Sequence, residues 1–136
     1  MTRNFLGSLL LALQLAAPSI FADECWSVTN IKGYSAFADK DYEFSKDGLR
    51  NPMLVCFGTD SGIVTGSDLQ FVRFGESTLI GLNANDKGNE VVEVYQIDRK
   101  RKKLLYVKSR IGTETVIPIF SDVALSFVGD AARAVK

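Results

Sequence analysis

Short runs of alternating apolar and polar residues, separated by turn-forming residues, fill most of the chain between positions 26 and 111. In residues 91–97, the odd-numbered side chains would lie on one face of a strand and the even-numbered ones on the other. Residues 104–109 form a second strong run. Gly, Asn and Asp stand between the runs, as in residues 83–89, where a hairpin would place Gly88 at a positive φ. This pattern predicts a mainly β protein, folded as a small antiparallel β-barrel or sandwich.

The remaining predicted strands are shorter. They cover residues 26–31 with a continuation at 34–37, then 42–44, 53–57, 63–65, 69–74 and 78–82. The dipeptides Asp47-Gly48 and Asn51-Pro52 are typical of turns. Because no internal repeat, low-complexity stretch or linker interrupts the sequence after its first 22 residues, we expect one domain.

The pattern changes near the C-terminus, after Pro118. Four apolar residues recur at every fourth position: Val123, Phe127, Ala131 and Val135. This spacing predicts a short C-terminal helix with one apolar stripe, beginning after an N-cap at Ser121 or Asp122. Gly129 would weaken that helix by about 1 kcal/mol relative to alanine. A strand through residues 125–128 is the alternative interpretation.

The first 22 residues have the order of a cleavable signal peptide. Arg3 gives a positive start, residues 5–17 are largely apolar, and a small residue, Ala22, stands at the expected cleavage site. The apolar stretch would span about 20 Å as a helix, which is shorter than the hydrocarbon core of a bilayer. We therefore predict removal of residues 1–22 and a single β-rich domain of residues 23–136 in the periplasm or outside the cell.

The two cysteines, Cys25 and Cys56, both lie in the expected mature chain. An even number of cysteines in an oxidising compartment predicts one disulfide. Asp23 and Glu24 stand where a lipoprotein needs a small residue before its modified cysteine. The sequence therefore predicts no stable membrane anchor.

Charge and composition exclude several classes of function. The chain has 16 basic and 16 acidic residues, a balance that argues against a dedicated nucleic-acid binder. It has no histidine, so the commonest general base and the usual zinc ligand are missing. The sequence predicts no catalytic residue, metal ligand or cofactor.

Carboxylates and serine leave an enzymatic alternative open. Asp39, Asp41 and Glu43 alternate, and in a strand they would share a face, as calcium binding or glycoside hydrolysis would require. Phe44, however, stands where a calcium loop needs glycine. A hydrolase that uses carboxylates or a Ser-Lys pair is therefore kept as an alternative function.

A run of five cations marks the expected hairpin between the two strongest strands. We extend it along the return strand to a candidate binding patch: Arg99, Lys100, Arg101, Lys102, Lys103, Lys108 and Arg110. Such a tip attracts phosphates, carboxylates or an acidic partner, but it also keeps a hairpin soluble and discourages edge pairing.

These observations favour an exported, non-enzymatic envelope protein that binds another macromolecule, as an inhibitor or a protective module. In size, export and one expected disulfide, the chain is similar to small periplasmic lysozyme-inhibitor barrels, although it lacks their loop motif. Because aromatic residues are frequent, a lipocalin-like carrier of a small apolar ligand is a further alternative. The sequence leaves open whether the partner is a protein or another envelope component, and what the oligomeric state is.

Overall fold

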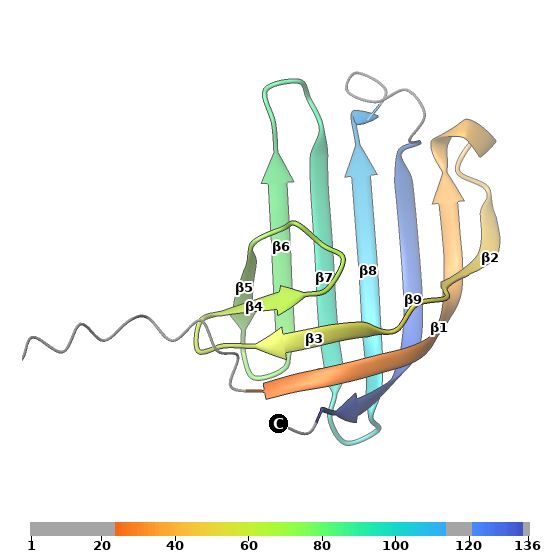
Figure 1. Cartoon of the computed structure of the whole chain (residues 1–136). Coiled ribbons are helices and arrows are strands. Elements are labelled where there is room, and N and C mark those ends of the chain that lie inside the picture. The colour runs from red at the N-terminus through yellow and green to blue at the C-terminus, as the bar shows by residue number, and fades with distance from the viewer. Residues whose placement is uncertain (1–23, 114–120, 135–136) are drawn as a thin grey trace, which may run out of the picture.

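One antiparallel sheet, closed into a barrel, makes up the fold (Figure 1). The computed structural model describes residues 24–113 and 121–134, so the predicted signal peptide and Val135 lie outside the described residues. The strand order is β2-β1-β3-β4-β5-β6-β7-β8-β9, and β1 also pairs with β9. This last pairing closes eight strands, with β2 as an extra strand, and the predicted mainly β barrel is confirmed.

The strands follow the predicted alternation closely. They are β1 (Glu24–Phe37), β2 (Phe44–Leu49), β3 (Met53–Phe57), β4 (Ser61–Val64), β5 (Phe71–Phe74), β6 (Thr78–Ala84), β7 (Glu90–Asp98), β8 (Lys103–Ile111) and β9 (Val123–Arg133). The β6–β7 hairpin has Gly88 at φ 86°, as predicted. The turn predicted at Asp47-Gly48 is wrong, because both residues belong to β2 and pair with β1.

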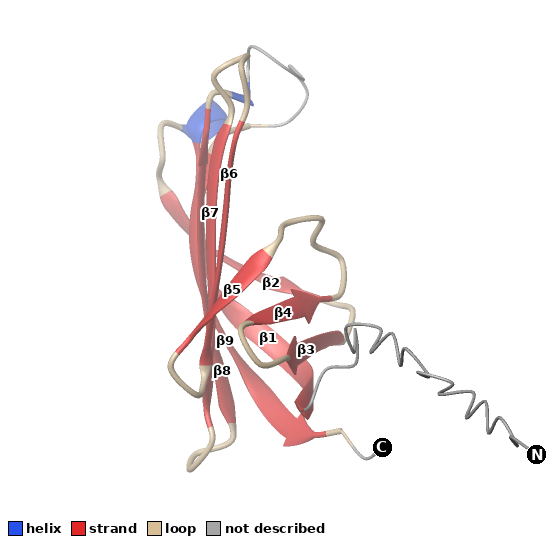
Figure 2. Cartoon of the chain, turned by 90° about the vertical axis from the view of Figure 1, so that its left-hand side faces the viewer, coloured by secondary structure: helices blue, strands red, loops and turns tan. Residues whose placement is uncertain are grey.

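The long strand β1 gives the barrel its shape. Its first residues pair with β3 and its later ones with β2, whereas β9 runs beside nearly its whole length. The β1–β9 register shifts between Thr29 and Lys32, and Asn30 has φ 53°, which marks a β-bulge that bends the strand. As a result, the short strands β3, β4 and β5 close only one part of the barrel. The long strands extend beyond them (Figure 2).

The predicted C-terminal helix is wrong. Among the described residues the one helical element is a 3-10 turn, η1 (Ala38–Lys40), and the C-terminal segment is β9. A spacing of four residues is close to one helical turn but equals two full repeats of a strand, so Val123, Phe127 and Ala131 share a face in either structure. In β9 that face is buried against the core. The alternative interpretation, a strand through residues 125–128, is confirmed.

The core lies inside the closed part of the barrel. Its buried members are Trp26, Val28, Ile31, Met53, Val55, Phe57, Val64, Phe71, Leu79, Tyr95, Ile97, Leu104, Tyr106, Phe127 and Ala131. On the outside, the predicted disulfide joins Cys25 of β1 to Cys56 of β3 at directly paired positions. The cross-link therefore ties the first strand of the barrel to its neighbour.

Candidate functional site: the pocket at the barrel mouth

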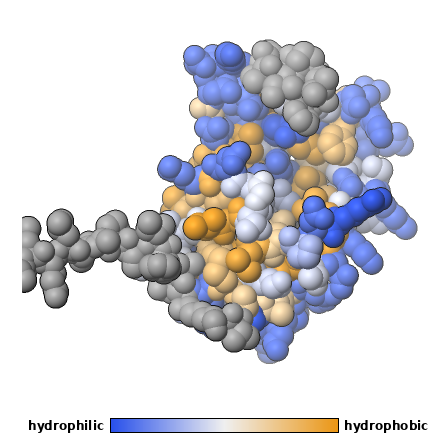
Figure 3. Space-filling view, viewed as in Figure 1, coloured by the Kyte–Doolittle hydropathy of each residue, from blue (hydrophilic) through white to orange (hydrophobic). Residues whose placement is uncertain are grey.

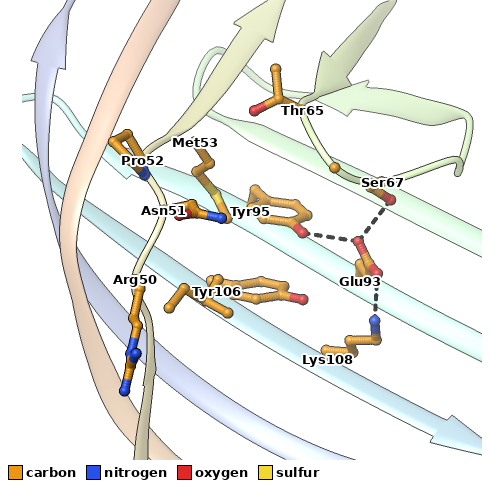
Figure 4. A pocket seen from close by; sticks show the side chains of 12 residues that line it. Arg50, Asn51, Pro52, Met53, Thr65, Ser67, Glu93, Tyr95, Tyr106 and Lys108 are labelled. Carbon is orange, nitrogen blue, oxygen red and sulfur yellow. Dashed lines mark hydrogen bonds and ion pairs between the residues drawn. The ribbon is translucent and has the colours of Figure 1, made fainter. Parts of the chain in front are cut away.

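A pocket of about 500 Å³ lies where the short strands end and the sheet continues (Figure 4). The strands β7 and β8 form its floor, and the segments 49–53 and 65–67 form its walls. Its lining residues are Leu49, Arg50, Asn51, Pro52, Met53, Thr65, Gly66, Ser67, Glu93, Tyr95, Tyr106 and Lys108. Figure 3 shows this side of the molecule, with hydrophobic residues near its centre and hydrophilic residues towards its margins.

Strand alternation carries the polar groups of the pocket to its floor. Glu93 and Tyr95 point inward from β7, opposite Lys108 and Tyr106, their direct partners on β8. Glu93 is only 4% exposed. A buried carboxylate of this kind is costly unless it is paired and hydrogen-bonded.

Three side chains stabilise the Glu93 carboxylate. Lys108 Nζ lies 3.0 Å from Oε1. The hydroxyls of Tyr95 and Ser67 donate to Oε2 at 2.9 and 3.1 Å. With Ser67 coming from the β4–β5 connection, the network links one wall of the pocket to its floor (Figure 4).

The two tyrosines form a stacked pair beside the charges. The rings of Tyr95 and Tyr106 are 4.3 Å apart between centroids and lie within 8° of parallel. Burial raises the pKa of both hydroxyls, to about 12 for Tyr106. The nearby Glu93 carboxylate raises both values further. Both phenols are therefore neutral near pH 7 and available as hydrogen-bonding groups.

The arrangement provides binding chemistry. The floor offers a carboxylate, an ammonium group and two phenols, and Arg50 and Asn51 stand on the wall. Both Glu93 oxygens are already engaged, which leaves this carboxylate poorly placed to take a proton from a substrate. In the described part of the chain, no three residues of the metal-ligating types cluster together.

Arg99, the first residue of the predicted cationic patch, lies at the opposite, closed end of the barrel. Its guanidinium contacts Glu24 at 2.6 Å, donates to Ser77 at 2.7 Å, and lies over the ring of Trp26. Only 30% of its side chain is exposed. It thus joins the β7–β8 turn to the start of β1 and to the β5–β6 turn.

The other residues of the predicted patch do not all lie together. Lys100, Arg101 and Lys102 are exposed at the hairpin tip, and Arg101 pairs with Asp98. Lys103 pairs with Asp130 of β9. Lys108 lies in the pocket, and Arg110 donates to the Ser121 carbonyl at 2.9 Å near the far end of β8. The structure therefore groups the tip residues together and places Lys108 and Arg110 elsewhere.

The alternating carboxylates do not share a strand face. Asp39 lies in η1, Asp41 follows it at φ 52°, and Glu43 precedes β2. The pair proposed as an N-cap has another role: the Asp122 carboxylate accepts hydrogen bonds from the backbone of Gly112 and Thr113 and from the Thr113 hydroxyl. These bonds hold the end of β8 to the start of β9 and, although burial opposes the effect, lower the pKa of Asp122.

Sequence reasoning placed Glu93 and Tyr95 on one strand face but did not identify them as a site. The available signal was a carboxylate between apolar residues on the inward face of a strand, a position that requires a partner. Ser67 and Arg50 had no comparable signal, because they reach the pocket from connecting segments.

The fold and the pocket define a class of structure: an eight-stranded antiparallel barrel, cross-linked by one disulfide, with a charged and aromatic pocket at its mouth. No family model matches the chain, and neither a curated protein nor a solved structure matches it. Within the described residues, no helix has the length and apolar character that crossing a membrane would require.

Proposed function

We propose that this chain is an exported, non-enzymatic protein of the periplasm or cell exterior, and that it binds another macromolecule at the mouth of its barrel. The observation that carries the proposal is the Glu93–Lys108 pair beside two tyrosines, on the floor of an open pocket. In this proposal a protruding polar group of the partner enters the pocket. The rest of the partner rests on the surrounding rim.

The size and charge of the pocket fit such a group. A volume of about 500 Å³ is in the range of binding pockets, yet it holds only a small part of a macromolecule. Charges of both signs favour a group that has both donors and acceptors, such as a charged side chain or a saccharide unit. An apolar ligand would remove the Lys108 side chain, which is 21% exposed, from water without replacing that contact, and this disfavours the apolar-carrier alternative.

The scaffold around the pocket supports a preformed site. The disulfide ties β1 to β3, and Arg99 fastens the closed end of the barrel. The floor is built on two central strands that pair over nine residues each. Because these elements are held in place before binding, little conformational entropy is lost when a partner docks.

The test compares capture by the original protein with capture by a variant whose pocket is blocked. Asn51→Trp places a large side chain on the wall, at an exposed position outside the strands. Ile63→Trp on β4, which is 54% exposed and not among the pocket residues, is the matched control. Each immobilised protein is exposed to an envelope extract of its source cell, and bound material is quantified by mass spectrometry.

A partner retained by the original protein and by Ile63→Trp, but lost by Asn51→Trp, supports the proposal. A Glu93→Gln/Lys108→Gln double variant, which keeps side-chain hydrogen bonding but removes both charges, should also lose it. Equal capture by all four proteins would remove the pocket from the explanation.

A further inference from the structure

The outer face of strands β5 to β9 is apolar and exposed. Outward positions of an antiparallel barrel are usually polar, but here six large apolar residues stand there: Val72, Phe74, Leu82, Leu105, Val107 and Val128. Their exposed fractions range from 44% for Leu105 to 70% for Phe74. We call these six residues and the positions between them the outer apolar face.

Strand register makes this face continuous. Val107 pairs with Val94 of β7, which pairs with Ile80 of β6, which in turn pairs with Val72. These paired residues form one row across the strands. In the next row, Val128 pairs with Leu105, which pairs with Gln96. Both rows lack charged residues between β5 and β9. Acidic and basic residues begin only at the strand ends.

No other described element covers the central strands on this side. Strands β3 and β4 and the pocket lie on the opposite side of β6, β7 and β8, and β5 crosses over from that side (Figure 2). Because side chains alternate along a strand, Val107 points away from the pocket that its neighbours Tyr106 and Lys108 line. A partner on the outer apolar face would therefore leave the barrel mouth open.

The area of this face approaches what one partner buries in a stable interface. At about 4.8 Å between strands, five strands span roughly 20 Å, and the exposed apolar side chains present on the order of 600 Å². That is the upper limit of the largest apolar patch on a typical monomer, and it approaches the roughly 800 Å² that each partner buries in a specific complex.

We propose that a second copy of this chain covers the outer apolar face, forming a symmetric dimer of two sheets packed face to face. An apolar face whose central rows carry no charges is self-complementary, which is what a two-fold interface between identical chains requires. Two barrels joined in this way pack like the layers of a β-sandwich, about 10 Å apart.

Charges at the strand ends select the orientation of the second copy relative to the first. Val94 stands at the centre of β7, four residues from Glu90 and four from Asp98. A two-fold axis that crosses the strands near Val94 puts the Glu90 end of each copy over the hairpin tip of the other. The exposed Lys100 and Lys102 then face the Glu90 end of the partner copy, whereas the other orientation would bring the two cationic tips together.

The test is the oligomeric state of the chain, expressed from Met1 and purified as the cell processes it. Sedimentation equilibrium over a micromolar concentration range should give a dimer. Val107→Asp should weaken dimerisation by roughly a hundredfold or more, because it buries two unpaired carboxylates near the axis. Ile63→Asp is the matched control: Ile63 is 54% exposed on β4, outside this face, and its substitution should leave the dimer intact.

Several results would overturn the second-copy proposal: a monomer at every concentration, a dimer that persists in Val107→Asp, or equal dissociation by Ile63→Asp. If Val107→Asp fails to fold, the milder Leu105→Ser/Val107→Ser variant makes the same comparison. A monomer that co-sediments with phosphatidylglycerol vesicles would assign the face to a lipid surface, against a second copy. Pocket variants such as Asn51→Trp should remain dimeric, so this proposal and the binding function can fail separately.

Discussion

Arg99 shows how one residue in a run of cations has a structural role that its neighbours lack. It makes an ion pair with Glu24, donates to Ser77 and to the Glu76 carbonyl, and lies over two aromatic rings. The five donors of guanidinium suit these dispersed acceptors, whereas an ammonium group cannot reach them all. Lys100, the next residue, is exposed.

We expect Arg99→Lys to lower the free energy of unfolding by about 1–3 kcal/mol, although the charge is kept, because partly buried acceptors lose their donors. Lys100→Ser is the control and should change it by less than about 0.5 kcal/mol. Urea unfolding followed by tryptophan fluorescence would measure both, since Trp26 lies beneath Arg99. Equal effects of the two substitutions would contradict this role.

The sequence predicted the position of single residues correctly where the alternation of side chains along a strand was sufficient. Val91, Glu93, Tyr95 and Ile97 were expected on one face, and this face does point inward. The same alternation separates Lys108 from the hairpin tip, because Lys108 lies on the inward face of β8 with Leu104 and Tyr106. The alternation of side chains cannot identify a contact with a residue that is distant in sequence. Glu24 precedes Arg99 by 75 positions, and nothing local to either residue indicates their contact.

At the scale of elements, β9 shows the limit of periodicity. The alternation in β7 and β8 excludes a helix, but a spacing of four is compatible with both structures. Gly129 was the one sequence feature that argued against the predicted helix, since a glycine in a helix interior is unfavourable. In β9 it is buried opposite β1, where an added Cβ would lie 2.7 Å from a methyl carbon of Val28 and 3.1 Å from Ile31.

This difference gives a prediction of opposite sign for the two structures. In a helix, Gly129→Ala would increase stability by about 1 kcal/mol. In the strand, we expect it to decrease stability by about 1–3 kcal/mol, because the methyl group overpacks the contact with β1. Thermal unfolding of Gly129→Ala would distinguish them, and Ser126→Ala, on the exposed face of the same strand, is the control. An increase in melting temperature would argue against β9.

At the scale of the whole molecule, three carboxylates connect different strands of the barrel. Glu24 joins β1 to the β7–β8 turn, Asp122 joins the start of β9 to the end of β8, and Asp130 pairs with Lys103. Although burial raises the pKa of Glu24, hydrogen bonds from Arg99 and Trp26 and the charges of Arg99 and Arg133 lower it overall. Hydrogen bonds from Thr113 and Lys103, respectively, lower the pKa values of Asp122 and Asp130.

These lowered pKa values predict that acid weakens the barrel. Since the unfolded chain holds its carboxyl protons more tightly than the folded one, the stabilisation is present above the unfolded values of about 4 and is lost as pH falls below them. We therefore expect the melting temperature to vary little from neutral pH to about pH 5 and then to fall steadily towards pH 3.

Glu24→Gln should begin with a lower melting temperature at neutral pH but lose less of it over the acid range, because one of the titrating groups is gone. Calorimetric melting at matched ionic strength would show this convergence, and parallel curves for the two proteins would mean that Glu24 takes no part in the acid response.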